Sequence, residues 1–339
     1  MGLQGAKVLV TGAAGFIGYH TCQQLLAAGA TVCGIDNFSP YYDVRLKEDR
    51  AARLLAQPGF ALHRLSIQDM DAMRAVWTDF APGIVIHLAA QPGVRYSIDH
   101  PREYIDTNVV GTFNLLELAR HHPVEHLLIS STSSVYGANT DIPFDEGQAI
   151  QKPMSLYAAT KGATELIGHS YSHLFGIPAT YFRFFTVYGP WGRPDMAPFK
   201  FTDAIAAGRA IDVYNNGDMA RDFTFVDDLV AAILGLAEAV PGKTRVAGDS
   251  LSPVAPFRAV NIGGGRQTRL LDFIAEIERA LGKPAIKNMM PMQAGDVEVT
   301  EASNHLLRAL IGRVPETPPS MGVPRFVAWY RDYYGDRLR

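Results

Sequence analysis

The sequence has few cysteines and no long hydrophobic run. Only Cys22 and Cys33 occur among its 339 residues, and both fall in segments that are expected to form the interior of a helix and of a strand. Two such cysteines are typical of small buried side chains in a reducing compartment, and they argue against disulfide or zinc chemistry. No apolar stretch approaches the roughly 20 residues that span a bilayer, and no basic-then-apolar leader opens the chain. We therefore expect a cytoplasmic protein without a metal or a membrane partner.

The sequence also lacks an excess of positive charge. It contains 31 Lys and Arg residues against 34 Asp and Glu residues, which gives a formal net charge of −3. Without a basic field, nucleic acid is not an expected partner, and any anionic ligand has to be met by individual arginines. With 47% hydrophobic residues, a chain of this length can bury a large core and divide into two domains.

What the sequence does contain is a regular alternation of strand-like and helix-like segments. The strand-like runs are KVLVTG, TVCGID, GFALHRL, GIVIHLAA, HLLISS and ATYFRFF. Strands that alternate with helices imply right-handed crossovers and a mostly parallel sheet that is covered on both faces. The pattern therefore predicts an α/β protein with a Rossmann-type, doubly wound parallel sheet.

The alternation breaks after residue 186. Loops rich in Pro and Gly follow, such as YGPWGRPDMAPFKF and GDSLSPVAPF, and helices are expected at 226–239 and 269–281. We interpret this change as a smaller C-terminal substrate domain that is interleaved with the first domain. The first domain then comprises 1–185 and 225–262, and the second comprises 186–224 and 263–339.

A glycine-rich turn, TGAAGFIG, joins the first predicted strand to its helix. Gly12, Gly15 and Gly18 allow backbone N–H groups and the helix N-terminus to approach a diphosphate that any Cβ would push away. A tight turn that merely needs glycine would have the same sequence, but Asp36 at the end of the second strand favours a dinucleotide site. This carboxylate would bind the adenosine ribose and repel a 2′-phosphate, which predicts NAD rather than NADP in the first domain.

A tyrosine and a lysine, Tyr157 and Lys161, lie four residues apart in a predicted helix, so their side chains project from one face. Together with a positive nicotinamide, the lysine cation is expected to lower the pKa of the phenol so that it can act as a base. A solvent-facing pair on any helix would look the same. Thr132 at the end of a predicted strand, where it would hydrogen-bond the reacting hydroxyl, completes a candidate catalytic centre.

The spacing of the turn, G-x-x-G-x-x-G, resembles that of the short-chain dehydrogenase/reductase superfamily, and further stretches carry the resemblance along nearly the whole chain. Those similar to the cofactor-lining and catalytic segments are HLAAQPGVRYS (87–97), TNVVGT (107–112), SSTSSVYG (130–137) and YAATK (157–161). The second half resembles the extended, nucleotide-sugar branch, most closely the UDP-glucuronate 4-epimerases. That match is carried by RFFTVYGPWGRPDMAPFKFTDAI (183–205), RDFTFVDDLV (221–230), NIGGG (261–265) and MQAGD (292–296).

The resemblance implies a reversible C4 epimerisation of UDP-glucuronate to UDP-galacturonate. Tyr157 would take the proton of the C4 hydroxyl while the C4 hydride passes to bound NAD, and a 4-keto sugar would rotate and receive the hydride on its opposite face. A UDP-glucose/UDP-galactose 4-epimerase and a UDP-glucuronate decarboxylase remain as enzymatic alternatives. A non-catalytic NAD-binding sensor is a third alternative, against which the intact Thr132, Tyr157 and Lys161 argue.

Two serines bear on the fate of the substrate carboxylate. Related decarboxylases usually carry Glu where this chain has Ser134, and related 4,6-dehydratases carry an Asp-Glu pair in place of Ser133 and Ser134. A serine pair can hydrogen-bond a carboxylate without repelling it, and the resemblance places Thr186 and Arg193 to hold it further. A carboxylate fixed in polar contacts disfavours the charge-neutral transition state for the loss of carbon dioxide.

The resemblance also assigns the remaining contacts, with Arg221 on the diphosphate and Lys200 beside the uracil. The residues expected to bind the cofactor are Gly12, Gly15, Phe16, Ile17, Gly18, Asp36, Asn37, Ile67, Leu88, Ala89, Ala90, Asn108, Tyr157 and Lys161. The residues expected to bind the UDP-sugar are Arg95, Thr132, Ser133, Ser134, Thr186, Arg193, Lys200, Val213, Tyr214, Arg221 and Asp296.

Three further features follow from the comparison with that family. Ser66 stands where the family commonly has an Asp that contacts adenine, with Asp69 three residues later, so this contact stays unassigned. The family pairs as a homodimer through two helices of each subunit, which are expected here at 101–121 and 156–174. The loop at 243–258 has no chemistry that the sequence assigns.

Overall fold

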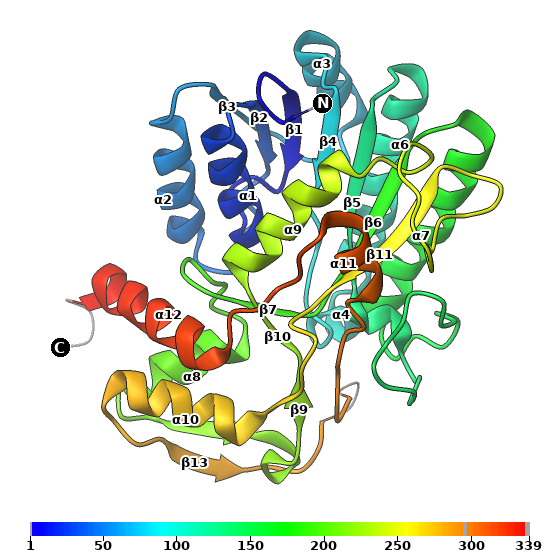
Figure 1. The fold of residues 1–339 in the computed structure, drawn as a ribbon. Helices are drawn as coiled ribbons and strands as arrows, with labels where there is room; N and C mark the ends of the chain where they lie inside the picture. Colours follow the sequence, from blue (N-terminus) through cyan, green and yellow to red (C-terminus); the bar gives the residue numbers. More distant parts are fainter. Residues whose placement is uncertain (1, 294–296, 336–339) are drawn as a thin grey trace.

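The structure, a computed structural model, describes residues 2–293 and 297–335. Its centre is a seven-stranded sheet with the order β11-β6-β5-β4-β1-β2-β3 (Figure 1). All neighbouring strands in it run parallel, so the predicted Rossmann-type sheet is confirmed. The strands are β1 Lys7–Thr11, β2 Thr31–Asp36, β3 Phe60–Arg64, β4 Ile84–His87, β5 His126–Thr132, β6 Ala179–Phe184 and β11 Phe257–Ile262.

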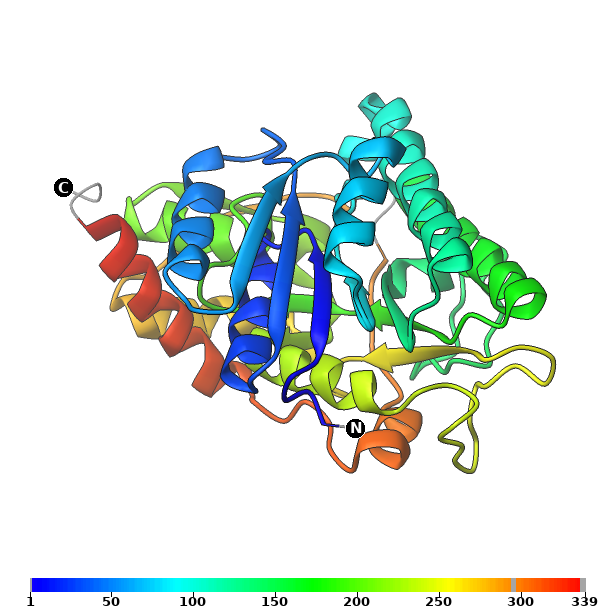
Figure 2. The same cartoon turned by 90° about the horizontal axis from the view of Figure 1, so that it is seen from above.

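Helices cover both faces of this sheet, which is why its strands are nearly continuous apolar runs. One apolar core joins the sheet to α1 Phe16–Ala27, α2 Val44–Leu55, α9 Val226–Glu238 and α11 His305–Ile311. A second core joins the other face to α3 Met70–Phe80, α6 Gly111–His121 and α7 Leu156–Phe175. Figure 2 shows the sheet between these two groups of helices.

Shorter elements form a smaller body below the carboxyl ends of the strands in Figure 1. Its helices α8 Ala197–Ala206, α10 Leu270–Leu281 and α12 Pro319–Tyr334 enclose a third apolar core rich in aromatic side chains. Its strands form three two-stranded sheets, β7 Thr186–Tyr188 with β10 Phe223–Phe225, β8 Ala210–Val213 with β13 Ile286–Met289, and β9 Ala220–Arg221 with β12 Thr268–Arg269. Between them the chain returns to the large sheet through α9 and β11. The residue bounds of the two domains stay a prediction.

The helix expected at 101–121 is interrupted in the structure. It begins as α5 Pro101–Tyr104, passes through a π-helical turn at Ile105–Val110 and continues as α6. The single expected helix is therefore wrong in detail, because apolar spacing alone does not reveal an inserted residue in a helical turn. Remaining short segments are α4 Tyr96–Asp99 and 3₁₀ turns at Ser133–Tyr136 and Tyr214–Gly217. Within the described ranges, no helix has both the length and the apolar character that crossing a membrane requires.

Two histidines are enclosed in the large sheet. His126 lies with Nδ1 3.1 Å from the Ala237 carbonyl oxygen and Nε2 2.8 Å from the Thr180 hydroxyl. His87 lies with Nδ1 2.6 Å from the Thr11 hydroxyl. Burial lowers the pKa of His126 to about 4 and that of His87 to about 3. Both imidazoles are therefore neutral in the folded protein at pH values where an unfolded histidine takes up a proton.

These histidines predict a loss of stability toward acid. Below pH ~6.5 the unfolded chain binds protons that the folded chain does not, so each histidine should lower the free energy of unfolding by about 1.4 kcal/mol per pH unit. We expect His126→Gln to remove one such contribution. Urea unfolding between pH 5 and 6.5 should then show a shallower slope of the free energy of unfolding against pH for the variant than for the unmodified protein. Glu146, whose pKa burial raises to about 7, acts with the opposite sign but equally in both proteins. Parallel slopes for the two proteins would contradict the prediction.

Candidate active site

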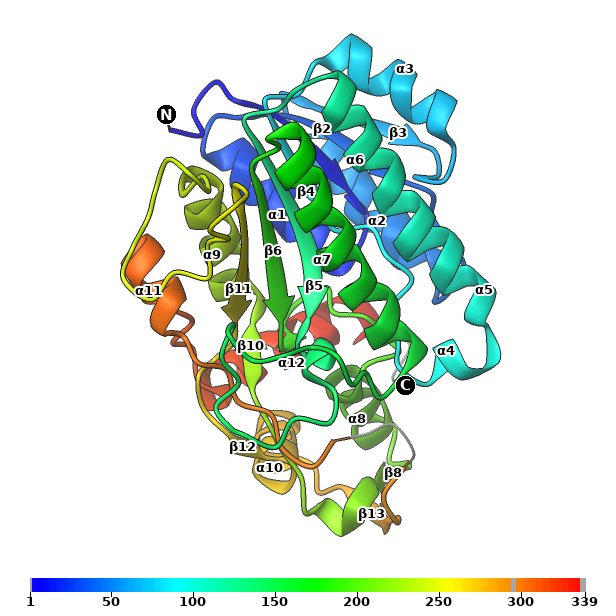
Figure 3. The same cartoon turned by 90° about the vertical axis from the view of Figure 1, so that its right-hand side faces the viewer.

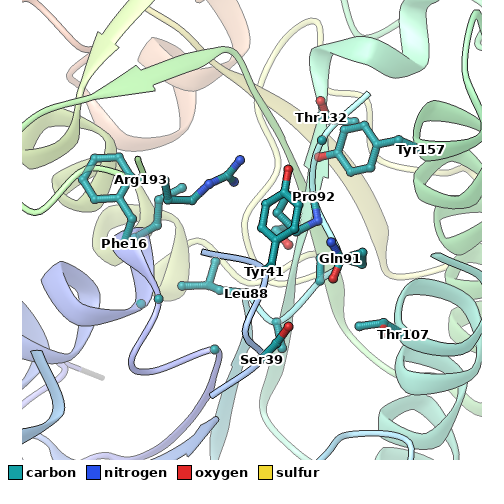
Figure 4. Close-up of a pocket in the computed structure, with 18 of the residues that line it drawn as sticks. Phe16, Ser39, Tyr41, Leu88, Gln91, Pro92, Thr107, Thr132, Tyr157 and Arg193 are labelled. Carbon is teal, nitrogen blue, oxygen red and sulfur yellow. The ribbon is translucent and has the colours of Figure 1, made fainter. Parts of the chain in front are cut away.

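A cavity of about 620 Å³ opens at the carboxyl ends of the parallel strands. Its wall combines the turns after β1, β2, β4 and β5 with the start of α7 and the segment that follows β6. The strand order reverses direction between β1 and β4, and a crevice at such a point is where open α/β sheets bind their ligands. Figure 4 shows side chains from both halves of the molecule pointing into it.

The glycine turn after β1 is as tightly packed as its sequence predicts. Gly12 has φ +72°, and a Cβ there would stand 2.8 Å from the Ala89 nitrogen. A Cβ on Gly18 would overlap the Gly12 carbonyl oxygen. The turn thus needs glycine for its own geometry as well as for access, and it brings the N-terminus of α1 to the cavity. A helix N-terminus and a bare turn together suit a diphosphate.

The carboxylate of Asp36 is fixed at the end of β2. Its Oδ2 accepts a hydrogen bond from the Ala14 N–H at 3.1 Å, and its Oδ1 accepts one from the Phe38 N–H at 2.8 Å. The Lys47 ammonium lies 3.9 Å from Oδ1 and also lines the cavity. Asp36 is therefore an oriented acceptor beside the glycine turn, as a ribose-binding acid requires.

The three expected catalytic residues come together on one wall. Thr132 ends β5, and its Oγ1 accepts a hydrogen bond from the Ser134 N–H at 3.2 Å. Ser155 caps α7 by accepting a hydrogen bond from the Ala158 N–H at 3.1 Å, which fixes the helical turn that carries Tyr157. Figure 4 shows Thr132 and Tyr157 facing each other across from Arg193. One helical turn further on, Lys161 donates to the Ser130 hydroxyl at 3.4 Å.

Burial dominates the protonation of this pair. It raises the pKa of the Tyr157 phenol, against the hydrogen bond with Thr132 and the charge of Arg193, which both lower it. From the sequence, Lys161 and a bound, positive nicotinamide together were expected to lower this pKa. Among the protein's own groups, desolvation of the phenolate outweighs the neighbouring charges. The joint effect of Lys161 and NAD stays a prediction. Burial also lowers the pKa of the Lys161 ammonium to about 8, although the Glu165 carboxylate opposes this.

Arg193 reaches the cavity from the opposite side and is held in a fixed orientation. Its Nε and Nη2 donate to Asp195 at 3.0 and 2.6 Å. The Tyr41 hydroxyl donates to the same carboxylate at 3.3 Å. Because Asp195 engages one edge of the guanidinium, the orientation of the other edge is set before any ligand arrives.

The cavity brings together most of the expected residues. It is lined by Gly12, Gly15, Phe16, Ile17, Gly18, Asp36, Asn37, Ile67, Leu88, Ala89, Ala90, Thr132, Ser133, Ser134, Tyr157, Lys161, Thr186 and Arg193. A smaller cavity of about 150 Å³ shares Ser133, Ser134 and Thr186 with it and extends to Arg221. The two cavities together place the expected cofactor and diphosphate residues along one path.

Several expected residues do not line either cavity. Asn108 is buried behind the wall, where its side chain accepts from the Gln91 N–H at 2.8 Å and donates to the Thr160 hydroxyl at 3.1 Å. Lys200 is exposed on α8, and Val213 is buried in the core of the smaller body. Asp296 lies outside the described residues.

Arg95 and Tyr214 lie together outside both cavity walls. The Arg95 guanidinium is 4.7 Å from the centre of the Tyr214 ring. Cation–π contact at this distance joins the loop after β4 to the smaller body. Their expected roles in substrate binding stay predictions.

The family model for the NAD dependent epimerase/dehydratase family matches residues 8–248, which include the glycine turn, Asp36 and the catalytic trio. The chain belongs to this family. Its membership confirms the expected extended short-chain dehydrogenase/reductase type and the expected cofactor, NAD. Gly12, Asp36 and the buried Lys161 ammonium suit that dinucleotide in the geometry described above.

Relatives within the epimerase/dehydratase family cover nearly the whole chain. A probable UDP-glucuronate 4-epimerase of Rhizobium meliloti is 51% identical over 97% of this chain and 98% of its own length. UDP-glucuronate 4-epimerase 4 of Arabidopsis thaliana is 42% identical over 98% of this chain and 77% of its own. A UDP-glucuronic acid 4-epimerase of Bacillus cereus, solved with UDP-glucuronic acid and NAD, superposes with a TM-score of 0.87 at 32% identity, covering 96% and 99% of the two chains.

Several residues of the site had no individual role assigned from the sequence. Tyr41, Lys47 and Gln91 line the cavity, and Asp195 holds its arginine. An aromatic and basic stretch after Asp36, SPYYDVRLK, was the available signal for the first two. Asp69, considered beside Ser66 for an adenine contact, instead caps α3 by accepting from the Ala72 N–H at 3.1 Å.

The environment of Asp36 predicts that the protein binds NAD more tightly than NADP, by at least about tenfold. A 2′-phosphate would face the Asp36 carboxylate, and Lys47 offsets that repulsion only in part. Calorimetric titration with both cofactors measures the ratio, and Asp36→Ser should reduce it. Equal affinities in the unmodified protein would show that Asp36 does not face the ribose.

Proposed function

We propose that the protein interconverts UDP-glucuronate and UDP-galacturonate by inverting C4 of the sugar with bound NAD. The observation that carries this is the pairing, across one cavity, of Tyr157 and Thr132 with an oriented Arg193. The first two suit a hydroxyl that loses a proton, and the arginine suits a carboxylate a few bonds away. The names of the Rhizobium, Arabidopsis and Bacillus relatives support the same activity.

The proton step falls to Tyr157. As a phenolate it would take up the proton of the C4 hydroxyl and become the phenol, while Thr132 donates to or accepts from the same oxygen and orients it. Lys161 lies one helical turn away, where its cation favours the phenolate. When bound beside them, NAD accepts the C4 hydride of the sugar and later returns it. For the configuration to invert, the resulting 4-keto sugar has to present its other face before the hydride is returned to C4, and the Tyr157 phenol then gives its proton back to the C4 oxygen.

The carboxylate must survive this step, because a 4-keto uronate is a β-keto acid. Ser133, Ser134 and Thr186 offer hydroxyls to it and Arg193 offers a charge, and all four line the main cavity. No carboxylate stands at 133 or 134 to repel it or to replace it. Polar contacts that keep the negative charge localised disfavour the loss of carbon dioxide, so epimerisation rather than decarboxylation follows.

An uncharged hexose is the second candidate substrate. A UDP-glucose 4-epimerase of Thermotoga maritima, solved with UDP-glucose, superposes with a TM-score of 0.84 at 26% identity, covering 96% and 99% of the two chains. A hexose C6 hydroxyl, however, offers no negative charge to the edge of the Arg193 guanidinium that Asp195 leaves open. The uronate therefore accounts for more of the site than the hexose does.

Tyr157→Phe should leave the fold and NAD binding near normal and lower turnover by about 10²–10⁴-fold, because only the proton acceptor is lost. Separation of the C4 epimers from a UDP-glucuronate reaction measures the rate, and circular dichroism checks the fold. If the variant retains a substantial part of the activity, another group must transfer the proton.

Arg193→Ala should weaken apparent transition-state binding of UDP-glucuronate by about 1.5–3 kcal/mol, the range for a charged hydrogen bond. Turnover of UDP-glucose should change much less. Ratios of kcat/KM for the two sugars measure the difference, and the yield of UDP-pentose reports whether the freed carboxylate is lost. An enzyme that prefers UDP-glucose before any substitution, or that makes mainly UDP-pentose, contradicts the proposed function.

We also propose that the protein pairs as a homodimer through α6, α7 and the π-helical turn before α6. Figure 3 shows α6 and α7 side by side on one outer face. That face exposes large apolar side chains at Val110, Phe113, Leu166 and Leu174, of which Leu166 is 69% exposed. Several large exposed apolar side chains on one helix pair are typical of a protein–protein contact.

Leu166→Glu should shift the protein from dimer to monomer, because a carboxylate at the centre of a symmetric contact meets its own copy. Sedimentation equilibrium measures the mass. Met321→Glu is the matched control, since Met321 is also exposed and its helix, α12, lies away from α6 and α7 in Figure 1. A Leu166→Glu protein with the same mass as the control would rule the face out.

The cytoplasm is the compartment that we propose for this enzyme. Cys22 and Cys33 are both free and buried, and burial raises the pKa of each thiol, to about 11 for Cys33. Thiols of this kind act as apolar core side chains and need no oxidising surroundings.

A further inference from the structure

We propose that Arg50 is a positioning residue that joins the cofactor-binding turn to the loop carrying Arg193. One buried guanidinium would then set the geometry of both halves of the site. The inference rests on the carboxylate-binding role proposed above for Arg193. It assigns a function to a side chain that touches neither cavity.

The contacts of Arg50 span the two halves of the molecule. It lies on α2 with no exposed surface. Its Nη1 donates to the Ala14 carbonyl oxygen at 3.0 Å and to the Tyr42 hydroxyl at 2.8 Å, and its Nη2 donates to the Trp191 carbonyl oxygen at 2.5 Å. Ala14 belongs to the glycine turn, and its own N–H donates to Asp36. The same guanidinium therefore holds the diphosphate turn and the segment that follows β7.

Burying this guanidinium costs more free energy than a purely structural contact would justify. Within residues 2–293 and 297–335, no carboxylate lies within 4.0 Å of the Arg50 guanidinium, so two carbonyls, the Tyr42 hydroxyl and the Tyr42 ring, whose centre is 5.7 Å away, compensate a fully buried charge. Trp191 has φ +61°, a conformation that bulky residues rarely adopt. A buried cation and a strained backbone at one joint are typical of a functional constraint.

The contact between Arg50 and the Trp191 carbonyl oxygen sets the position of the backbone that leads into Arg193. The Trp191 ring is packed against Tyr19 at 5.5 Å and against Trp329 at 5.4 Å between ring centres. Its carbonyl is held by Arg50, and the next residue, Gly192, donates to the Gly189 carbonyl at 3.1 Å. Arg193 follows directly, and Asp195 then fixes its guanidinium. Loss of the Arg50 contact would free the backbone two residues before Arg193.

Two consequences separate this role from simple stabilisation. Removing the bridge should weaken recognition of the substrate carboxylate, because Arg193 is no longer held in register with Tyr157. It should also weaken NAD binding, because the Ala14 carbonyl loses its partner in the turn. Recognition of the uridine diphosphate should change little, because Arg221, the residue expected to bind the diphosphate, is not among these partners of Arg50.

Arg50→Lys keeps the charge but reaches only one of the two carbonyls, so it tests the bridge itself. We expect the affinity ratio of UDP-glucuronate to UDP-glucose, measured by calorimetry on NAD-loaded enzyme, to fall about tenfold. The Kd of NAD should rise at least about fivefold. Arg53→Lys is the matched control, because Arg53 lies on the same helix and its partners are the Trp191 ring, at 4.8 Å, and the Tyr19 side chain rather than a backbone carbonyl. That variant should keep both values.

An unchanged affinity ratio in Arg50→Lys, or an equal loss for both sugars, overturns the inference. The Arg193→Ala enzyme serves as the benchmark in the same assay. If Arg193→Ala leaves the affinity ratio unchanged, the proposed function fails. If Arg193→Ala lowers the ratio strongly and Arg50→Lys does not, only this inference fails. Should Arg50→Lys not fold, Tyr42→Phe removes a single partner of Nη1 and should shift the ratio in the same direction by about two- to threefold, and an unchanged ratio there is equally decisive.

Discussion

The direction of the parallel strands is the constraint on which the rest of the molecule depends. Because all seven strands of the large sheet run the same way, every turn that carries a reactive group meets at one edge. The reversal of strand order between β1 and β4 sends successive helices to opposite faces, which leaves a crevice at that edge. Asp36, Thr132 and Tyr157 are far apart in the sequence but converge there. The smaller body then closes the crevice from below and adds Arg193.

Buried charges fix the parts of this edge relative to one another. Glu165, one helical turn after Lys161, pairs with Arg183 of β6 at 2.7 Å and accepts from Ser131 of β5 at 2.5 Å. Such a pair adds little net stability, because both ions lose their hydration, but breaking it leaves an uncompensated charge. The pair therefore fixes the rotation of α7 on the sheet, and with it the place of Tyr157. Arg50 acts in the same way between the glycine turn and Trp191.

The sequence was sufficient for features that depend on local pattern. Apolar runs predicted the strands, and the glycine spacing with Asp36 predicted the dinucleotide turn. It was not sufficient where a role depends on which surface a side chain reaches. Asn108 was expected at the cofactor but is buried behind Gln91. Arg50 gave no signal at all, because the sequence of an amphipathic helix does not distinguish a buried arginine from an exposed one. The raised pKa of Tyr157 likewise follows from burial that only the fold determines.

The loop at 243–258, to which the sequence assigned no chemistry, has a structural explanation in the same terms. Arg258 at its end is fully buried and pairs with Asp249 at 2.7 Å, which folds the loop back on itself. The folded loop then meets the outer side of α7, where the Ser252 hydroxyl lies 2.9 Å from His169 Nε2. The helix that carries Tyr157 and Lys161 is thus held by an ion pair on the sheet side and by this loop on its flank. A helix restrained on two sides can keep its first turn in place while a sugar turns over beside it.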